Sequence, residues 1–341
     1  MRSDRAVTLQ DIADRLGITR STASFAITGR GRVSEDTRRR VLAVAEEIGY
    51  RPNNAARSLR GARTGALALR VPPNSHALPY YMHVISGITE EADRAGMVVF
   101  LLPSKPTDPA SRELAADAVI ALDPAQDDPV VRALLQGRSP VITAEPTPAG
   151  LPSGSAVVMG DHDAALRRLL DHLATQGMRH PGALIPDIGS HWAFTVRQTL
   201  IDWCASRGLL PRVHMLPFPA SPEMIARAVE DLVSPQGDGV TSDAILAATD
   251  GTALSVAATA QGLGRRIGQD LLVAALVDSE PLELTEPSIT ALDLDPRELG
   301  RRCVRAALAA LAASPDDPSP APDVVPVRLI IRSSTSTPLS R

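Results

Sequence analysis

The chain has 341 residues, of which 44% are hydrophobic and 22% are charged. This composition is ordinary for a folded protein and excludes collagen, a coiled coil or disorder as a description of the whole chain. The length predicts two or three domains. Because no apolar run approaches the roughly 20 residues of a membrane span, and because no signal peptide is recognisable, we expect a cytoplasmic protein with no membrane partner.

The net charge of −4 is distributed unevenly along the chain. Residues 1–63 contain 13 Arg and 7 acidic residues, which give +6, so the remaining 278 residues carry −10. A basic segment joined to an acidic body is typical of a nucleic-acid-binding domain attached to a domain of another kind. The two cysteines, Cys204 and Cys303, are isolated in helical patterns and indicate buried residues. We expect neither a metal site nor a cofactor.

The N-terminal segment has the pattern of three short helices. Thr8 is a candidate N-cap of the first helix, Gly17 ends it, and Thr19 can cap a second helix over residues 20–28. A third helix is expected over residues 35–48. Small residues and a glycine turn between the first two helices predict a helix-turn-helix. A three-helix bundle without a DNA-binding role is the alternative, but the coincident excess of Arg favours DNA binding.

A short helical segment over residues 54–60 follows, between a proline and a glycine. Isolated helices shorter than about 12 residues are marginal in water. We therefore expect this segment to fold only together with a partner.

Three motifs of the N-terminal segment resemble those of the lactose/galactose repressor family of bacterial transcription regulators. They lie at residues 7–19, 33–41 and 49–60, in the family's order and spacing. The resemblance implies a helix-turn-helix domain at 1–50, a hinge helix and linker at 51–63, and an effector-binding and dimerisation core at 64–341.

The resemblance also implies how the chain contacts DNA. The helix that begins at Arg20 would enter the major groove, where an Arg pairs with guanine. Leu59 falls on the family's leucine wedge, which kinks the duplex from the minor groove, and Ala56 falls on the small residue that lets two hinge helices approach. The DNA-binding residues implied in this way are Thr8, Thr19, Arg20, Ser21, Thr22, Ser24, Phe25, Arg32, Asn53, Ala56, Arg57 and Leu59.

Two positions of the second helix depart from the family pattern. Phe25 and Thr28 stand where the family usually has Arg and Asn. Phe25 either meets a thymine methyl group or packs on the helix bundle, and the sequence leaves both interpretations open.

From Thr64 onward, short apolar runs alternate with amphipathic segments, which is typical of a parallel α/β sheet. The pattern predicts strands at 66–71, 98–102, 118–122, 141–144, 182–185, 244–248, 271–277 and 324–331, and helices at 82–95, 163–176, 195–207 and 224–232. With the resemblance, this implies two lobes joined by three crossovers, similar to sugar-binding proteins of the periplasm. Lobe 1 would comprise about 64–159 and 293–323, and lobe 2 about 160–292 and 324–341.

In open parallel sheets a ligand binds beyond the carboxyl ends of the strands, which here is the cleft between the lobes. The resemblance implies that Arg197 and Asp278 contact the effector, and a guanidinium with a carboxylate can orient a polyol. Trp192 is the first choice among the aromatic candidates, which include Tyr81. The full predicted set is Tyr80, Lys105, Asp161, Trp192, Arg197, Phe218, Asp250 and Asp278. For Asp250, and also for Arg197 and Asp278, an interlobe salt bridge or a helix cap is the alternative.

No catalytic motif occurs, so we do not expect an enzyme. The sequence predicts a ligand-responsive transcription regulator, in the first place a repressor, that binds a pseudo-palindromic DNA operator as a homodimer and takes a sugar-like effector. A dimer is expected because no apolar heptad tail follows the last strand. The alternatives are a sugar-binding module that does not bind DNA, or a sugar-processing enzyme that uses Asp161, Asp250 and Asp278.

Overall fold

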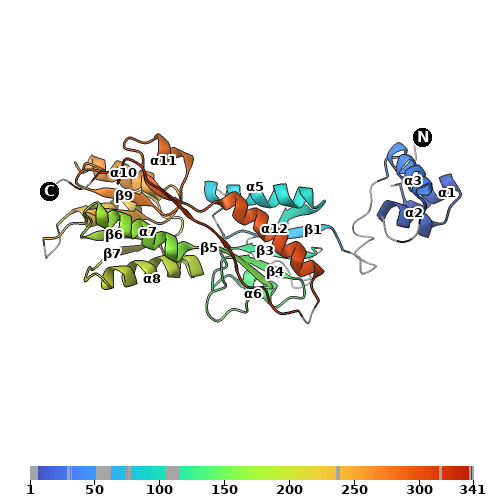
Figure 1. Cartoon of the computed structure of the whole chain (residues 1–341), viewed down its shortest axis with the longest axis horizontal. Coiled ribbons are helices and arrows are strands. Elements are labelled where there is room, and N and C mark those ends of the chain that lie inside the picture. Colours follow the sequence, from blue (N-terminus) through green and yellow to red (C-terminus); the bar gives the residue numbers. More distant parts are fainter. Residues whose placement is uncertain are drawn as a thin grey trace. The chain divides into compact units, whose positions relative to one another are not determined.

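The computed structural model describes residues 7–28, 31, 33–50, 63–73, 75, 78–103, 116–235, 239–314, 317–337 and 339. The chain divides into two compact units, Met1–Thr64 and Gly65–Arg341 (Figure 1). The N-terminal unit is called the head below, and the second unit is called the core. Several residues with predicted roles lie outside the described residues; they are Arg32, Asn53, Ala56, Arg57, Leu59 and Lys105.

The head is a bundle of three helices, as the sequence predicts. These are α1 (Leu9–Leu16), α2 (Arg20–Thr28) and α3 (Glu35–Glu47). The residues buried between them are small or branched and are Ile12, Ala13, Ala23, Ala26, Val41 and Ala45. Gly17 adopts a left-handed conformation with φ of 64°, which permits the tight turn between α1 and α2.

Side-chain caps fix the helix starts of the head. Both the backbone nitrogen and the hydroxyl of Thr8 donate to Asp11 Oδ2 at 2.7 Å. Thr19 Oγ1 accepts from the backbone nitrogen of Thr22 at 3.2 Å. Such caps satisfy backbone donors that a helix leaves unpaired, so local sequence is sufficient to place these helices.

The core contains two six-stranded sheets, one in each lobe (Figure 1). The lobe 1 sheet is parallel, in the order β11 (Asp323–Val325), β5 (Ala156–Gly160), β4 (Val141–Ala144), β3 (Ala118–Leu122), β1 (Ala66–Arg70) and β2 (Val98–Leu101). The lobe 2 sheet has the order β12 (Arg328–Ile330), β10 (Thr290–Asp293), β9 (Leu272–Ala275), β8 (Ala244–Ala247), β6 (Pro181–Pro186) and β7 (Arg212–Leu216). In this second sheet, β12 runs antiparallel to β10.

Helices cover both faces of each sheet. In lobe 1 these are α5 (Pro79–Arg94) and α12 (Pro296–Ala312) on one face and α6 (Pro129–Leu135) on the other. In lobe 2, α7 (His162–Thr175) and α8 (His191–Ala205) cover one face, and α9 (Pro222–Val233) and α10 (Thr252–Gly262) the other. A short helix, α11 (Glu280–Leu284), precedes β10. Buried strands therefore read as continuous apolar runs, which is why most of them are visible in the sequence.

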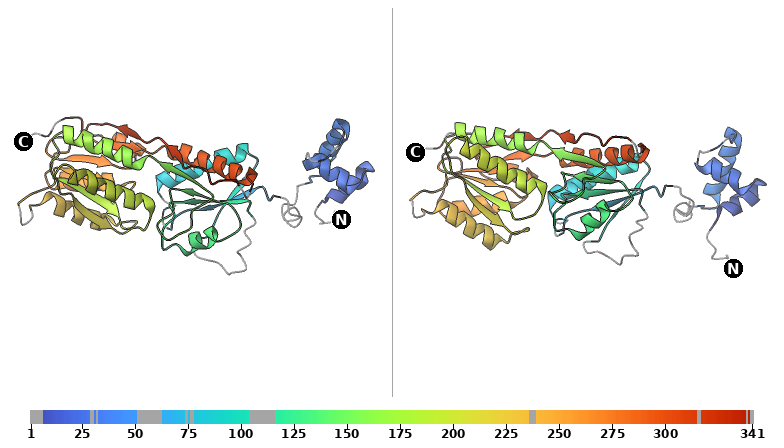
Figure 2. Two further views of the ribbon diagram at one scale, coloured as in Figure 1. Left: turned by 60° about the horizontal axis from the view of Figure 1, so that its bottom comes forward. Right: turned by 90° about the horizontal axis from the view of Figure 1, so that it is seen from below.

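The chain passes between the lobes three times, and the predicted architecture of two lobes with three crossovers is confirmed. The connections run from β5 to α7, from β10 to α12 and from β11 to β12. The views of Figure 2 show these segments running beside one another between the lobes.

The structure differs from the predicted elements at several places. The strands β5, β7 and β10 were not predicted; β7 and β10 carry polar residues, whereas β5 is apolar like the strands that were predicted. The predicted strand at 324–331 is instead β11 and β12, which belong to different sheets. Pro326 lies between them and has no backbone N–H to donate to a ladder. Helix α8 begins at His191, four residues before the predicted start.

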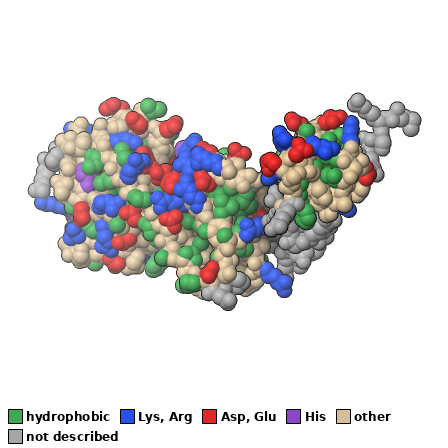
Figure 3. Space-filling view, turned by 45° about the vertical axis from the view of Figure 1, so that its right-hand side comes forward, with side chains coloured by type: hydrophobic (Ala, Val, Ile, Leu, Met, Phe, Trp, Pro, Cys, Tyr) green, Lys and Arg blue, Asp and Glu red, His purple; other side chains and the backbone are tan. Residues whose placement is uncertain are grey.

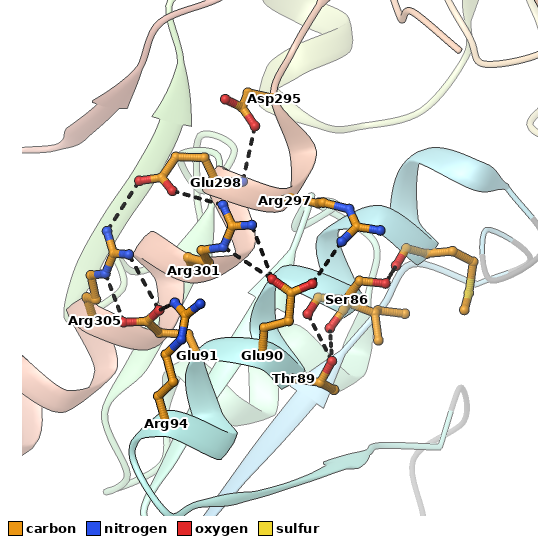
Figure 4. A network of polar contacts seen from close by, with 12 residues as sticks. Ser86, Thr89, Glu90, Glu91, Arg94, Asp295, Arg297, Glu298, Arg301 and Arg305 are labelled. Atoms are coloured by element: carbon orange, nitrogen blue, oxygen red, sulfur yellow. Dashed lines mark hydrogen bonds and ion pairs between the residues drawn. The ribbon is translucent and has the colours of Figure 1, made fainter. Parts of the chain in front are cut away.

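The helices α5 and α12 of lobe 1 cross at very short distance. Gly87 lies against the backbone carbonyl of Arg297, and Gly300 lies against that of Val84. Around this crossing the two helices exchange ion pairs, of which Glu90 with Arg297 at 2.8 Å is one (Figure 4). Acidic and basic side chains also lie side by side on the face of the core that Figure 3 draws. Exposed pairs of this kind contribute little stability, so the close backbone contact is the stronger constraint.

Replacement of Gly87 by Ala tests this contact. A methyl group there has no room beside the Arg297 carbonyl, and overpacking of this kind costs about 1–3 kcal/mol. We expect urea denaturation to show a free energy of unfolding of the core lowered by that amount. The control is Gly262→Ala at the end of α10, where an added methyl meets no atom within 4 Å. Equal stability of the two variants would contradict the prediction.

Candidate functional site

A cavity lies between the two lobes of the core, at the carboxyl ends of their strands. Its empty space amounts to about 500 Å³, part of which is open to solvent. The side chains that line it are mostly aromatic or aliphatic, with a few polar groups; they are Leu78, Tyr80, Tyr81, Asp123, Glu145, His162, Ile188, Trp192, Phe218, Thr249, Asp250, Val277 and Leu294. An apolar cavity with a few converging polar groups is the usual form of a small-molecule site.

Two acidic residues of lobe 1 enter the cavity directly from strand ends. Asp123 follows β3 and Glu145 follows β4, and their φ angles are 40° and 79°. A residue with a Cβ atom adopts this left-handed region at a cost of about 1–3 kcal/mol. The backbone nitrogens of both residues are held by the neighbouring strand, Asp123 by Ala144 and Glu145 by Val158. The sheet therefore stabilises a strained backbone that directs two carboxyl groups into the cavity.

These carboxyl groups are hydrogen-bonded to neighbouring cavity residues. The Tyr81 hydroxyl donates to Asp123 Oδ2 at 2.7 Å. Glu145 Oε1 accepts from the backbone nitrogen of Gly160 at 3.1 Å and lies 2.9 Å from His162 Nε2. The cluster thus links β3, β4, α5 and the start of α7.

The cluster shifts the protonation of its members. Burial, reinforced by the negative charge of Glu145, raises the pKa of Asp123 to about 7. Burial alone would lower the pKa of His162, but the adjacent Glu145 carboxylate outweighs it and raises that pKa above its usual value. Perturbed groups gathered in a cavity are typical of functional sites.

Asp250 connects the lobes. Its Oδ2 accepts a hydrogen bond of 3.0 Å from the backbone nitrogen of Tyr80, in the first turn of α5. The N-cap residue of α5, Leu78, has no side chain able to cap the helix, so the carboxylate of lobe 2 serves this purpose for a helix of lobe 1. Asp250 therefore acts as a helix cap, which is one of the alternatives that the sequence left open. A second interlobe bond runs from the nitrogen of Gln126 to the carbonyl of Gly189 at 3.0 Å.

The structure brings together four of the eight residues that the sequence placed in the cleft. Tyr80, Trp192, Phe218 and Asp250 line the cavity. Lys105 lies outside the described residues.

The other three predicted cleft residues lie elsewhere. Arg197 is exposed on α8, because the buried face of this helix is formed by positions such as Val196 and Leu200, which leaves position 197 on the solvent side. Asp278 forms an ion pair with Arg332, with N–O distances of 2.8 and 2.9 Å. Asp161 accepts from the backbone nitrogen of Val327 and lies 3.4 Å from Arg168, so it ties the crossovers together. None of these three residues lines the cavity.

Four polar residues of the cavity are absent from the predicted set, namely Asp123, Glu145, His162 and Thr249. The signal for the first two was present, because an acidic residue directly follows each of the apolar runs at 118–122 and 141–144. The rule that ligands lie beyond strand ends applies to them as well. For His162 no signal was available, since β5 itself was not recognised.

The head presents its predicted DNA contacts on α2. Arg20 and Ser21 are exposed at the start of this helix. Phe25 is 45% exposed and lies against Gly31, whose added Cβ atom would be 3.0 Å from the ring. The phenyl ring is therefore outside the buried cluster of the head and partly open to a partner.

Within the described part of the chain, no three His, Cys, Asp or Glu side chains are grouped in a way that could hold a metal ion. No helix among those residues is long and apolar enough to cross a membrane. Both cysteines are buried.

The head and the core each match a known family. Residues 8–53 match the bacterial regulatory proteins of the lacI family, and residues 170–335 match the periplasmic binding protein-like domain. The fold is thus that of a helix-turn-helix regulator with a binding-protein-like core. The helix-turn-helix of the head is thus that of the lacI family of bacterial regulatory proteins. The family matched by the head is one of regulatory proteins, the class that the sequence predicts.

Relatives support this assignment to different extents. The chain is 28% identical to a helix-turn-helix transcriptional regulator of Mycolicibacterium smegmatis, over 62% of this chain and 60% of that protein. It thus spans less than two thirds of that relative. With the regulator CelR of Thermobifida fusca the identity is 26%, over 89% of this chain and 92% of CelR.

Solved structures share the fold over nearly the whole chain. The lac repressor dimer bound to operator and the anti-inducer ONPF has a TM-score of 0.80 at 22% identity, covering 97% of this chain and 99% of that chain. The complex of CelR with cellobiose has a TM-score of 0.67 at 24% identity, covering 96% and 99%.

Removal of the Asp250 carboxylate, which caps α5 from the other lobe, should destabilise the core and let the lobes move apart. Replacing Asp250 by Ala removes the acceptor for Tyr80, and loss of a helix cap costs about 1 kcal/mol. We expect a lowered free energy of unfolding and a larger radius of gyration in small-angle X-ray scattering. Asp250→Asn keeps an acceptor oxygen and should stay close to the unmodified protein. An Ala variant as compact and stable as the Asn variant would refute the prediction.

The raised pKa of Asp123 predicts a dependence of stability on pH. Because the folded protein holds this proton up to about pH 7 while the unfolded chain loses it near pH 4, this residue destabilises the fold progressively between those values. Asp123→Asn should therefore stabilise the protein more at pH 8 than at pH 5, measured by urea denaturation. The control is the exposed Asp187→Asn. An equal effect of Asp123→Asn at both pH values would contradict this account.

Proposed function

We propose that this protein is an effector-responsive repressor that binds a pseudo-palindromic operator as a homodimer and a small sugar-like molecule in the cavity of its core. The observation that carries the proposal is the cavity itself, which is lined by residues of both lobes in a chain whose head exposes a helix-turn-helix. A ligand that contacts both lobes biases the angle between them.

The DNA-binding part of the proposal assigns the head, at residues 1–50, to the major groove and the hinge, at 51–63, to the minor groove. Arg20 reads a guanine, and Leu59 opens a central base step. Ser21, Thr22, Ser24 and Phe25 line the same helix, and Thr8 and Thr19 lie at helix starts, where backbone N–H groups can meet phosphates. The operator-bound lac repressor, which shares the fold, supports this arrangement.

The homodimer is supported by an exposed edge of the lobe 1 sheet. In β2, Val98, Phe100 and Leu101 are 57%, 37% and 59% exposed. Among the described residues β2 pairs only with β1, and contiguous apolar side chains on such an edge strand favour association with another chain. The lac repressor structure is a dimer, and we propose that a second copy of this chain covers β2.

The effector part rests on the four predicted residues that line the cavity together with Asp123, Glu145, His162 and Tyr81. A sugar-like size is supported by the structure of CelR, which was solved with cellobiose. Coupling between effector and DNA needs about 1–3 kcal/mol, and a two-turn hinge helix is marginal enough to respond to that amount. The proposed mechanism is that a changed lobe angle separates the paired hinges.

Operator selection from random duplexes followed by binding assays tests the proposal. We expect one pseudo-palindromic sequence to be enriched and Arg20→Ala to lose about 1–3 kcal/mol of discrimination. Leu59→Ala should bind with less bending of the DNA. Arg179→Ala, which alters an exposed Arg of the core, is the control.

Absence of any sequence preference would overturn the DNA-binding part. Unchanged affinity and bending for Leu59→Ala would overturn the hinge part alone.

A further inference from the structure

The polar lining of the cavity is rich in carboxyl groups. Three carboxyl groups, those of Asp123, Glu145 and Asp250, line it. None of its described lining residues is Arg, Lys, Asn or Gln. His162 neutralises at most one of the three carboxyl groups. The described lining is therefore acidic, and its donors are neutral hydroxyl and ring N–H groups apart from His162.

One of these acceptors is buried and has no partner. Glu145 is 3% exposed, and its Oε2 accepts no hydrogen bond from any residue that the structure describes. Its Oε1 is fully engaged, by Gly160 and His162. A buried carboxylate oxygen without a donor is costly, more so than a neutral group. The backbone of Glu145 is also strained, with a φ of 79°. A ligand that donates a hydrogen bond to Oε2 would offset the cost of burying this oxygen.

A neutral polyol leaves the carboxyl groups of this lining without a cationic partner. Each hydroxyl group accepts as well as donates, so a sugar needs donors from the protein. The Tyr81 hydroxyl already donates to Asp123, and His162 faces Glu145. An ammonium group, by contrast, donates three hydrogen bonds and accepts none.

The apolar walls also suit a cation. Tyr80, Tyr81, Trp192 and Phe218 line the same cavity. The faces of aromatic rings attract ammonium groups, and more strongly where water is excluded. Carboxylates together with aromatic rings thus form a site for an organic amine.

We propose that the effector of this protein carries a protonated nitrogen that ion-pairs with Glu145 beside Asp123, on a compact body that packs against the aromatic side chains. Amino sugars and small aromatic amines have this chemistry, whereas sugar phosphates and sugar acids do not. The inference rests on the proposed function, because it assigns a chemical class to the ligand of the same cavity.

Matched pairs of probes test the inference on the full-length protein. Glucosamine is compared with glucose, and tryptamine with tryptophol, by thermal shift and isothermal titration calorimetry at constant ionic strength. Each pair differs only in the replacement of a hydroxyl by an amine. We expect the amine of at least one pair to raise the melting temperature and to bind about tenfold or more tightly than its alcohol.

The variant Glu145→Gln should weaken binding of that amine by about tenfold and abolish the preference over the alcohol. It is expected to fold, because the Gln oxygen can still accept from Gly160. Asp123→Asn, as a second variant, should weaken binding of the amine in the same direction at pH 8, where Asp123 is ionised. Glu283→Gln, which removes the same charge from an exposed position on α11, should leave binding unchanged.

Binding of the alcohols as tight as that of the amines would overturn the inference, and so would amine binding that Glu145→Gln leaves intact. If neutral sugars bind and release the operator while amines do not, the inference fails and the proposed function stands. If no probe binds at all, the inference fails together with the effector role of the cavity.

Discussion

Three passages of the main chain between the sheets determine where a ligand can bind. Each sheet of the core is wound so that its strands end at the boundary between the lobes, and each is completed by a strand from the far end of the chain, β11 in one and β12 in the other. Because these two strands are separated by only two residues, Pro326 and Val327, the lobes are tied closely at this point. Movement between them is limited to a change of angle about the crossovers, as in hinged binding proteins.

Contacts across the boundary hold the lobes in the arrangement described here. The carboxylate of Asp250 reaches the N-terminus of α5, where the helix dipole favours a negative charge. Burial raises the pKa of Asp250, and the hydrogen bond from Tyr80 opposes this rise. The contact needs an acceptor oxygen at position 250, and a ligand that competes for this oxygen weakens the interaction that holds the lobes together. A ligand in the cavity can therefore change the angle between the lobes.

Backbone strain and buried carboxyl groups occur together in the wall of the cavity. Two of the non-glycine residues with positive φ, Asp123 and Glu145, lie in the cavity wall. Their carboxyl groups are close enough for Glu145 to raise the pKa of Asp123. Like charges and strained backbone are tolerated only where the surrounding sheet is stable and where function requires them. The apolar strands β3 and β4 supply that stability.

The sequence alone determined the three-helix head, the alternating pattern of the core and the family, because caps, glycine turns and buried parallel strands are local features of the chain. It also indicated Tyr80, Trp192, Phe218 and Asp250, since aromatic and acidic residues after apolar runs fall at strand ends. Only the tertiary structure decided that Arg197 faces solvent, that Asp278 is paired with Arg332 and that Glu145 has an unpartnered oxygen. These outcomes depend on the helical phase of α8 and on contacts between residues distant in the chain, such as Asp278 and Arg332, which no local pattern records.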